Sequence, residues 1–238
     1  MVLNGSYCGP SPMPGTLLEH WNFDPVLIAT LVGMMLLGPR LPVLERRCLV
    51  AAVAALIVAF VSPLCALSVA LFSARAVHHL VLVGVVAPLL AVVAGRGVRV
   101  GMAGGLVAST VSLWLWHIPA LYDAALANKA VYWVMQATLL GGAWAFWRAV
   151  FAAAPAVAAA GIAGGAAQMG MLGAILSFAP RPLYVSHLAS TIPYGMGPLA
   201  DQQLAGLLMW VIGLLPYAVA AGWLGRRGWR RLSPGLVA

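Results

Sequence analysis

The stretch AVHHLVLVGVVAPLLAVVAG, residues 76–95, contains no Asp, Glu, Lys or Arg. Its 20 residues match the roughly 20 that an α-helix needs to cross the hydrocarbon core of a bilayer. Apolar and polar residues do not alternate along it, so the stretch is not a strand of a membrane barrel. It therefore predicts a transmembrane helix.

The whole chain has the composition of an integral membrane protein. Of its 238 residues, 63% are apolar and only 8% are charged, whereas a soluble domain carries about 25% charged residues. At roughly 20 residues for each helix plus connections, the length allows at most about eight spans. This leaves no room for a second, soluble domain, and we expect residues 1–238 to form one membrane-embedded domain.

Uncharged apolar stretches recur along the chain. They predict seven transmembrane helices, at about residues 25–44, 48–70, 76–95, 100–117, 130–148, 153–178 and 202–225. The first contains Arg40, whose charge has to reach the lipid–water interface. Pro63 is expected to bend or end the second, and Arg75 marks the corner before the third. The predicted fold class is all-α, a polytopic membrane protein with seven transmembrane helices.

Basic residues are divided unequally between the two sets of connections. Lys and Arg are retained on the cytoplasmic side of membrane helices. One side has only Arg75, Lys129 and Arg181, whereas the other has Arg40, Arg46, Arg47, Arg96, Arg99, Arg148, Arg226, Arg227, Arg230 and Arg231. This predicts an N-terminus outside and a C-terminus in the cytoplasm. It also accounts for the net charge of +8 without a nucleic-acid partner.

All five histidines fall on the predicted outer side: His20, His78, His79, His117 and His187. Neutral imidazole binds copper, zinc and haem iron, so this side is a candidate metal or haem surface. The alternative is that these side chains simply bond to backbone or water. Met169, Met171 and Met196 are possible thioether ligands for copper(I), although a lone Met in an apolar segment usually packs.

Arg75 and His79 are four residues apart and share one face of a helix, while His78 is turned by about 100°. Because Arg75 stays protonated, it cannot ligate a metal. We therefore expect it to pair with an outer carboxylate, Asp123 or Asp201. Asp201 has an alternative role, since a carboxylate near the start of the last helix favours the helix dipole.

The remaining motifs concern helix packing, the cysteines, and two functional classes, enzymes and transporters. Glycines four apart in GMAGG (101–105) and GIAGG (161–165) predict close helix packing. Three cysteines, Cys8, Cys48 and Cys65, form no CxxC motif, and we assign them no redox role. There is no nucleophile–base arrangement, phosphate loop or paired-carboxylate spacing, so we do not expect an enzyme. A transporter is disfavoured because the charges lie at helix ends rather than mid-membrane.

Several stretches together resemble the CtaG family, seven-helix assembly factors of caa-type cytochrome c oxidases. The matching stretches are WNFDP (21–25), SPLCALSVALFSARAVHHLVLVGVVAPLL (62–90), LWHIPALYDAAL (115–126), FW (146–147), PLY (182–184) and DQQLAGLLMW (201–210). The resemblance implies a multi-pass protein of the plasma (cell inner) membrane. It also implies a chaperone of the respiratory chain, which helps to mature the copper centre of a haem-copper oxidase from the outer face of that membrane. Oxidase subunits are then its partners and copper its cofactor.

By motif, the resemblance carries over His79, His117, Asp123 and Asp201. Together with the histidine side derived above, it gives a predicted metal site of His79, His117 and His78. The predicted ionic support of that site is Arg75, Asp123 and Asp201.

The chain also departs from the family pattern. Family members typically carry His-x-x-x-His at the start of the third helix, and here the first position is Arg75. His78 stands where a Gln is common, and Tyr132 and Gln136 align with histidines of the fifth helix. Two alternatives follow: a scaffold or accessory oxidase subunit that binds no metal, and a haem-binding protein with His79 and His117 as axial ligands. Membrane lipid and a second copy in a homo-oligomer complete the expected partners.

Overall fold

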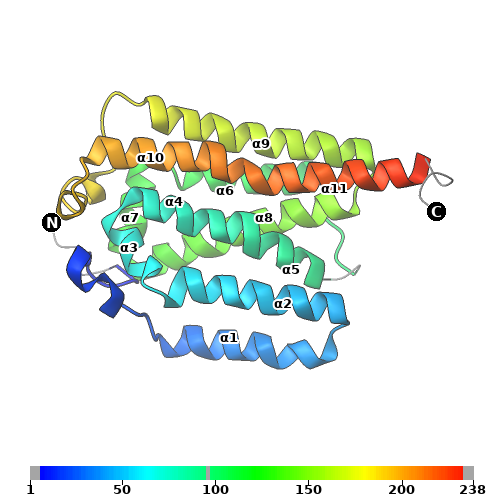
Figure 1. Ribbon diagram of the computed structural model, residues 1–238, viewed down its shortest axis with the longest axis horizontal. Coiled ribbons are helices and arrows are strands. Elements are labelled where there is room, and N and C mark those ends of the chain that lie inside the picture. Colours follow the sequence, from blue (N-terminus) through cyan, green and yellow to red (C-terminus); the bar gives the residue numbers. More distant parts are fainter. Residues whose placement is uncertain (1–5, 95–96, 233–238) are drawn as a thin grey trace.

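The computed structural model describes residues 6–94 and 97–232, and among these the side chains up to residue 229. Arg96, counted above for the orientation, lies outside these ranges. Every long regular element of the described residues is a helix, and none of them is a strand. The long helices run alongside one another (Figure 1). The α1–α2 connection and the far end of α11 lie at one end of the bundle, and the α9–α10 loop lies at the other.

The chain passes through the bundle as a series of helical rods. The α-helices are α1 (Pro25–Leu37), α2 (Val43–Leu56), α3 (Leu64–Ala70), α4 (Phe72–Val81), α5 (Ala87–Val93), α6 (Met102–Leu115), α7 (Pro119–Ala127), α8 (Lys129–Ala152), α9 (Pro155–Phe178), α10 (Pro198–Val211) and α11 (Leu215–Leu232). Single helical turns continue three of them: η3 (Ile57–Val61) after α2, η4 (Leu82–Val86) between α4 and α5, and η7 (Ile212–Leu214) between α10 and α11.

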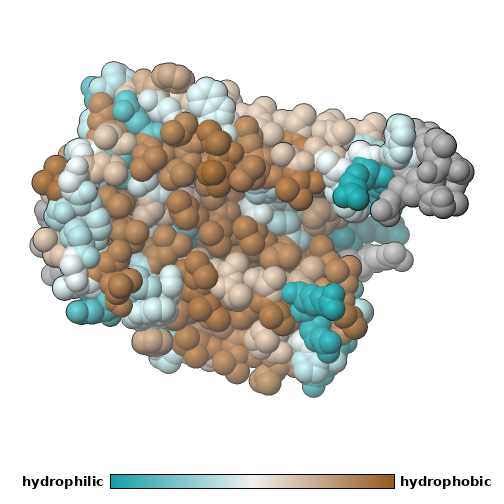
Figure 2. All heavy atoms as spheres, in the orientation of Figure 1, coloured by the Kyte–Doolittle hydropathy of each residue, from teal (hydrophilic) through white to brown (hydrophobic). Residues whose placement is uncertain are grey.

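Between three and five of these rods have the length and composition to cross a membrane. The three straight ones are Phe72–Val93, Pro155–Phe178 and Pro198–Trp229. Two bent pairs make five if each pair is one span: Val43–Val61 with Leu64–Ala70, bent by 46°, and Met102–Leu115 with Pro119–Ala127, bent by 77°. Figure 2 shows apolar residues over the middle of one face of the bundle and hydrophilic residues towards its two ends. A bilayer protein has this distribution.

The chain bends by 46° between Val61 and Leu64, where Pro63 was expected to bend or end the second helix. The predicted corner at Arg75 is wrong. The chain breaks at Leu71, whose backbone is extended (φ −118°, ψ 131°), and Arg75 lies inside α4. The first helix ends with the turn at Arg40 rather than at residue 44. The last begins at Pro198 rather than at residue 202, because Pro is well suited to the first turn of a helix.

Glycines allow the helix backbones to approach closely, as the GMAGG motif predicts. A β-carbon on Gly105 of α6 would lie 2.8 Å from the carbonyl oxygen of Ala145 on α8. The approach of α9 to α10 is equally close, since a β-carbon on Gly173 would lie 2.7 Å from the carbonyl oxygen of Gly206. Such contacts with backbone atoms leave no room for a side chain.

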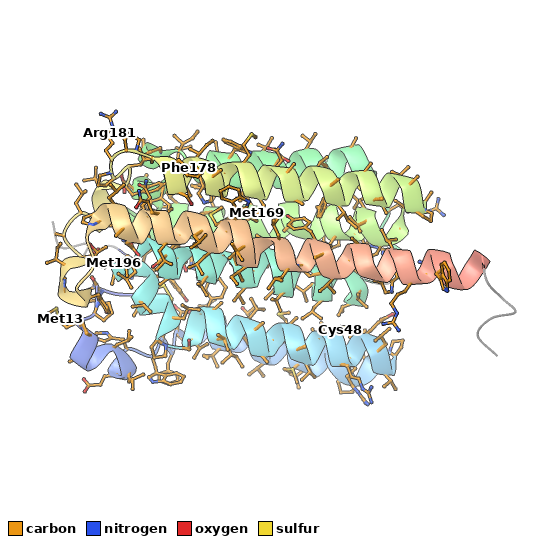
Figure 3. The ribbon with its side chains drawn as sticks, turned by 45° about the horizontal axis from the view of Figure 1, so that its top comes forward. Met13, Cys48, Met169, Phe178, Arg181 and Met196 are labelled. Atoms are coloured by element: carbon orange, nitrogen blue, oxygen red, sulfur yellow. A yellow bond between two sulfur atoms is a disulfide. The ribbon has the colours of Figure 1, made fainter. Side chains whose placement is uncertain are left out.

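A disulfide between Cys8 and Cys65 ties the N-terminal segment to α3. Cys48, on α2 (Figure 3), is free. The sequence offered no reason to pair these two cysteines, because 57 residues separate them. The bond fixes the N-terminal segment at the end of the bundle where α3 meets α4.

Candidate functional site

The candidate site residues of α4 are buried inside the bundle. Arg75, His78 and His79 are 1%, 0% and 8% exposed, and the rings of the two histidines lie 5.6 Å apart. On α8, Tyr132 and Gln136 are also buried, and they lie one helical turn apart on one face. We call these five residues the inner polar cluster.

Several polar atoms of the inner polar cluster have no hydrogen-bond partner. They are both ring nitrogens of His78, Nε2 of His79, the two terminal nitrogens of Arg75, and the side-chain amide of Gln136. Buried polar atoms are normally paired, so these are the hydrogen-bonding groups of the cluster that its own packing leaves free.

Arg75 does not form the predicted ion pair with Asp123 or Asp201. Its Nε donates to the carbonyl oxygen of Ser68 at 3.2 Å, and its guanidinium carbon lies 5.4 Å from the centre of the Tyr132 ring. The charge is therefore stabilised by a backbone dipole and by an aromatic face. That prediction was wrong because both carboxylates are engaged by backbone N–H groups elsewhere.

Asp201, on the first turn of α10, caps α4 instead of its own helix. One carboxylate oxygen accepts from the backbone N–H of Phe72 at 2.6 Å. The other accepts from the N–H of Ser73 at 3.1 Å and from the Ser73 hydroxyl. Leu71, at the N-cap position of α4, has no side-chain oxygen to do this. A carboxylate at a helix N-terminus satisfies free N–H groups and favours the helix dipole.

Asp123 of α7 holds the loop between α9 and α10, residues 179–197. It accepts from the hydroxyl of Ser186 at 2.6 Å and from the Ser186 N–H at 3.1 Å. The amide oxygen of Gln202 accepts from the N–H of Leu183 at 2.7 Å. The loop is thus attached to two helices by polar side chains, next to the break between α3 and α4.

His187, in the same loop, is a structural residue. Its Nδ1 lies 3.2 Å from the carbonyl oxygen of Ala70, and a carbonyl only accepts, so this nitrogen carries the proton. Nε2 then accepts from the hydroxyl of Tyr122 at 2.7 Å. Burial lowers the pKa of His187 to about 4, and hydrogen bonding to Ala70 opposes that shift. The ring is neutral with both nitrogens occupied, which leaves none for a metal.

His117 lies at the turn between α6 and α7. Its Nδ1 is 2.7 Å from the carbonyl oxygen of Leu113, so Nε2 is the nitrogen left for other chemistry. No hydrogen bond or ring contact joins His117 to His79 in the described part of the chain.

The methionines considered as copper(I) ligands do not meet. Met169 lies partway along the bundle, whereas Met196 lies in the loop at its end (Figure 3). Arg181, in the same loop, points away from the bundle. Met171 is 47% exposed, while Met169 is 3% exposed. Met169 packs in an apolar core with Leu172 and Met209.

The residues present do not fit a closed copper site. Among the described residues, no three His, Cys, Asp or Glu side chains converge in a way that would hold a metal ion. His78 and His79 are neighbours, but the nearest charged group of the cluster is the cationic Arg75, one turn before His79. A copper ion there would have no negative charge to balance it.

Sequence reasoning missed Tyr122, Tyr184 and Gln202 as parts of this region. Tyr184 donates its hydroxyl to the carbonyl oxygen of His117 at 3.0 Å and stacks on Phe72 at 4.2 Å. Tyr184 and Gln202 lie within the motifs PLY and DQQLAGLLMW, and these motifs were the sequence feature that could have identified them. What they bind, backbone groups of distant segments, is not visible in the motifs.

The family model described as cytochrome c oxidase caa3 assembly factor (Caa3_CtaG) matches residues 98–231, more than half of the chain. The chain belongs to this family. The suspected resemblance to CtaG is thereby confirmed. The Caa3_CtaG match includes His117, Asp123 and Asp201, and it begins after Arg75, His78 and His79. Neither a comparison with curated proteins nor one with solved structures gave a match.

Proposed function

We propose that this Caa3_CtaG protein acts at the outer membrane face while the copper centre of a caa3-type oxidase is matured. It acts there as a binding partner of an oxidase subunit and carries no resident copper ion. The observation that supports this is Arg75. Its fixed positive charge is buried in the inner polar cluster beside His78 and His79, where no third ligand or anion accompanies them among the described residues.

The proposal includes seven spans with the N-terminus outside. α8 has 24 residues, long enough to cross a bilayer at about 1.5 Å per residue. The shorter apolar rod Pro25–Arg40 crosses if Arg40 reaches the interface. The Cys8–Cys65 disulfide supports the orientation, because disulfides persist in oxidising compartments such as the periplasm.

Copper delivery by the protein itself is the second candidate. The unpaired nitrogens of His78 and His79 favour it, because imidazole nitrogen is a copper ligand. His117 offers a further imidazole. If the protein delivers copper, the ion is cargo that it passes on to the oxidase.

Copper(I) loading of the full chain in detergent under reducing conditions separates the two candidates. Metal content is measured for the wild type, Arg75→His and His79→Ala. We expect the wild type to retain less than one equivalent of copper. Arg75→His should retain more, because it removes the charge and creates two imidazoles one helical turn apart.

Stoichiometric copper in the wild type that is lost in His79→Ala would overturn the first candidate and support copper delivery. A Soret band in the purified protein would instead support haem ligation by His79 and His117. Co-purification of oxidase subunits with the tagged chain, at equal yield for wild type and His79→Ala, is expected for a partner that works without copper.

A further inference from the structure

A groove of about 1160 Å³ opens on the side of the bundle. Its floor is the rod formed by α4 and α5, its sides are α11 and the first turn of α2, and the last turns of α8 line it as well. Figure 1 shows α4 and α5 lying between α2 and α11 on the face that Figure 2 presents. The groove is larger than the roughly 300–1,000 Å³ of small-molecule sites. No residue of the inner polar cluster lines it.

The greater part of the groove is apolar. Leu80, Val85 and Pro88 come from the floor, and Pro216 and Val219 come from α11. Val85 and Val219 are 43% and 72% exposed. A floor and wall of this kind, in a chain with membrane-spanning helices, offer a surface for acyl chains.

One end of the groove is basic. Arg99, Arg148 and Arg227 line it together with a single carboxylate, Glu45. Arg148 is only 8% exposed, and its Nε donates to the carbonyl oxygen of Val98 at 3.0 Å. The guanidinium of Arg227 lies 5.4 Å from the centre of the Trp223 ring. At least two of the three arginines are therefore held in place by neighbouring groups.

One exposed tryptophan marks the depth of this end. Trp223, which is 43% exposed, lines the groove one helical turn before Arg227. Trp side chains gather at the membrane–water interface, so the arginines lie at the level of lipid headgroups. Their side of the bundle is the one with most of the basic residues, which is the side that faces anionic lipid in the cytoplasmic leaflet.

We infer that this groove binds a phospholipid with an anionic headgroup. The phosphate lies among Arg99, Arg148 and Arg227, and the acyl chains follow the apolar floor of α4 and α5. Charge complementarity favours this occupant over a partner helix, because a transmembrane helix rarely carries the negative charges that three arginines would pair with. The inference shares the membrane orientation of the proposed function, because it places the arginines in the cytoplasmic leaflet, and it does not depend on the oxidase role.

Native mass spectrometry of the full chain in detergent tests it, with phosphatidylglycerol and phosphatidylcholine as probes. The groove variant is Arg99→Gln/Arg148→Gln/Arg227→Gln. Its control is Arg46→Gln/Arg47→Gln/Arg226→Gln, which removes the same charge outside the groove. We expect the groove variant to lose roughly tenfold to 100-fold in phosphatidylglycerol affinity, and the control to lose less than about threefold.

Occlusion of the floor gives a second measurement that is independent of the arginines. Val219→Trp should weaken phosphatidylglycerol binding, whereas Val32→Trp, on an exposed apolar position of α1, should not. Equal affinity for the two lipids, or equal losses in the two arginine triples, would overturn the inference. A groove that accepts a partner's helix would give the first of these results.

Discussion

At the scale of single residues, Asp201 has a role that its own helix does not suggest. It lies in α10 and caps α4. We expect Asp201→Ala to lower the free energy of unfolding by about 1–2 kcal/mol, since a lost cap leaves buried N–H groups unpaired. Thermal unfolding in detergent checks this. Glu19→Ala, which removes an exposed carboxylate, should have little effect, and equal losses in the two variants would contradict the assignment.

His187 should make stability depend on pH. Its pKa is about 4 in the folded protein, below its ordinary value of 6.5. Between pH 6.5 and pH 4 the unfolded chain binds a proton that the folded chain does not, so stability falls as pH falls. The loss reaches about 3 kcal/mol near pH 4.

Thermal midpoints of wild type and His187→Gln, measured from pH 7 to pH 4, test this effect of burial. The variant should show a shallower pH dependence. His20→Gln, in the N-terminal segment, should keep the wild-type slope. A variant and wild type with parallel profiles would show that His187 is not the group responsible.

The sequence identified several polar residues of the site, but it did not identify their hydrogen-bond partners. Arg75, Asp123 and Asp201 were singled out as one ionic group, yet both carboxylates serve backbone N–H groups. The partner of Asp201 is 128 residues away in the chain, and spacing along a single helix cannot reveal such a contact. Where the signal is local, as for Arg75 and His79 on one helix face, the placement agrees.

At the scale of helices, glycine contacts set the distance between neighbouring rods. Gly173→Ala should destabilise the protein by about 1–3 kcal/mol, because the added carbon meets backbone atoms of α10. Gly170→Ala is a matched control on the same helix, where the added carbon meets only Trp210 at ordinary contact distance, 3.8 Å. Thermal unfolding of both variants measures the difference, and equal stability of the two would contradict close α9–α10 packing.

Helix positions were predictable because a span must be apolar for about 20 residues, and α8 and α9 lie close to their predicted ranges. The break at Leu71 was not predictable. No Pro or Gly interrupts the sequence there, and the N–H groups that it frees are satisfied by Asp201 from another helix. Tertiary contacts, rather than local propensity, determine where α3 ends and α4 begins.

At the scale of the whole molecule, the proposed orientation decides which compartment the inner polar cluster and the α9–α10 loop face. That loop also contacts the N-terminal segment, since Tyr194 donates its hydroxyl to the carbonyl oxygen of Pro12, and the Cys8–Cys65 disulfide joins the same segment to α3. If the end of the bundle with this loop faces outward, the groove arginines face the cytoplasm. One topology therefore supports both the proposed function and the lipid inference.

Three exposed glycines allow the orientation to be measured with matched substitutions. A β-carbon on Gly15, Gly97 or Gly197 meets nothing within 4 Å, so Cys at each should leave the fold intact in a Cys48→Ser background. We expect a membrane-impermeant maleimide to label Gly15→Cys and Gly197→Cys in intact cells, and Gly97→Cys only after permeabilisation. The reverse pattern would place the inner polar cluster on the cytoplasmic side. Action on an outer copper centre would then be ruled out, because the cluster and its loop would lie across the membrane from that centre.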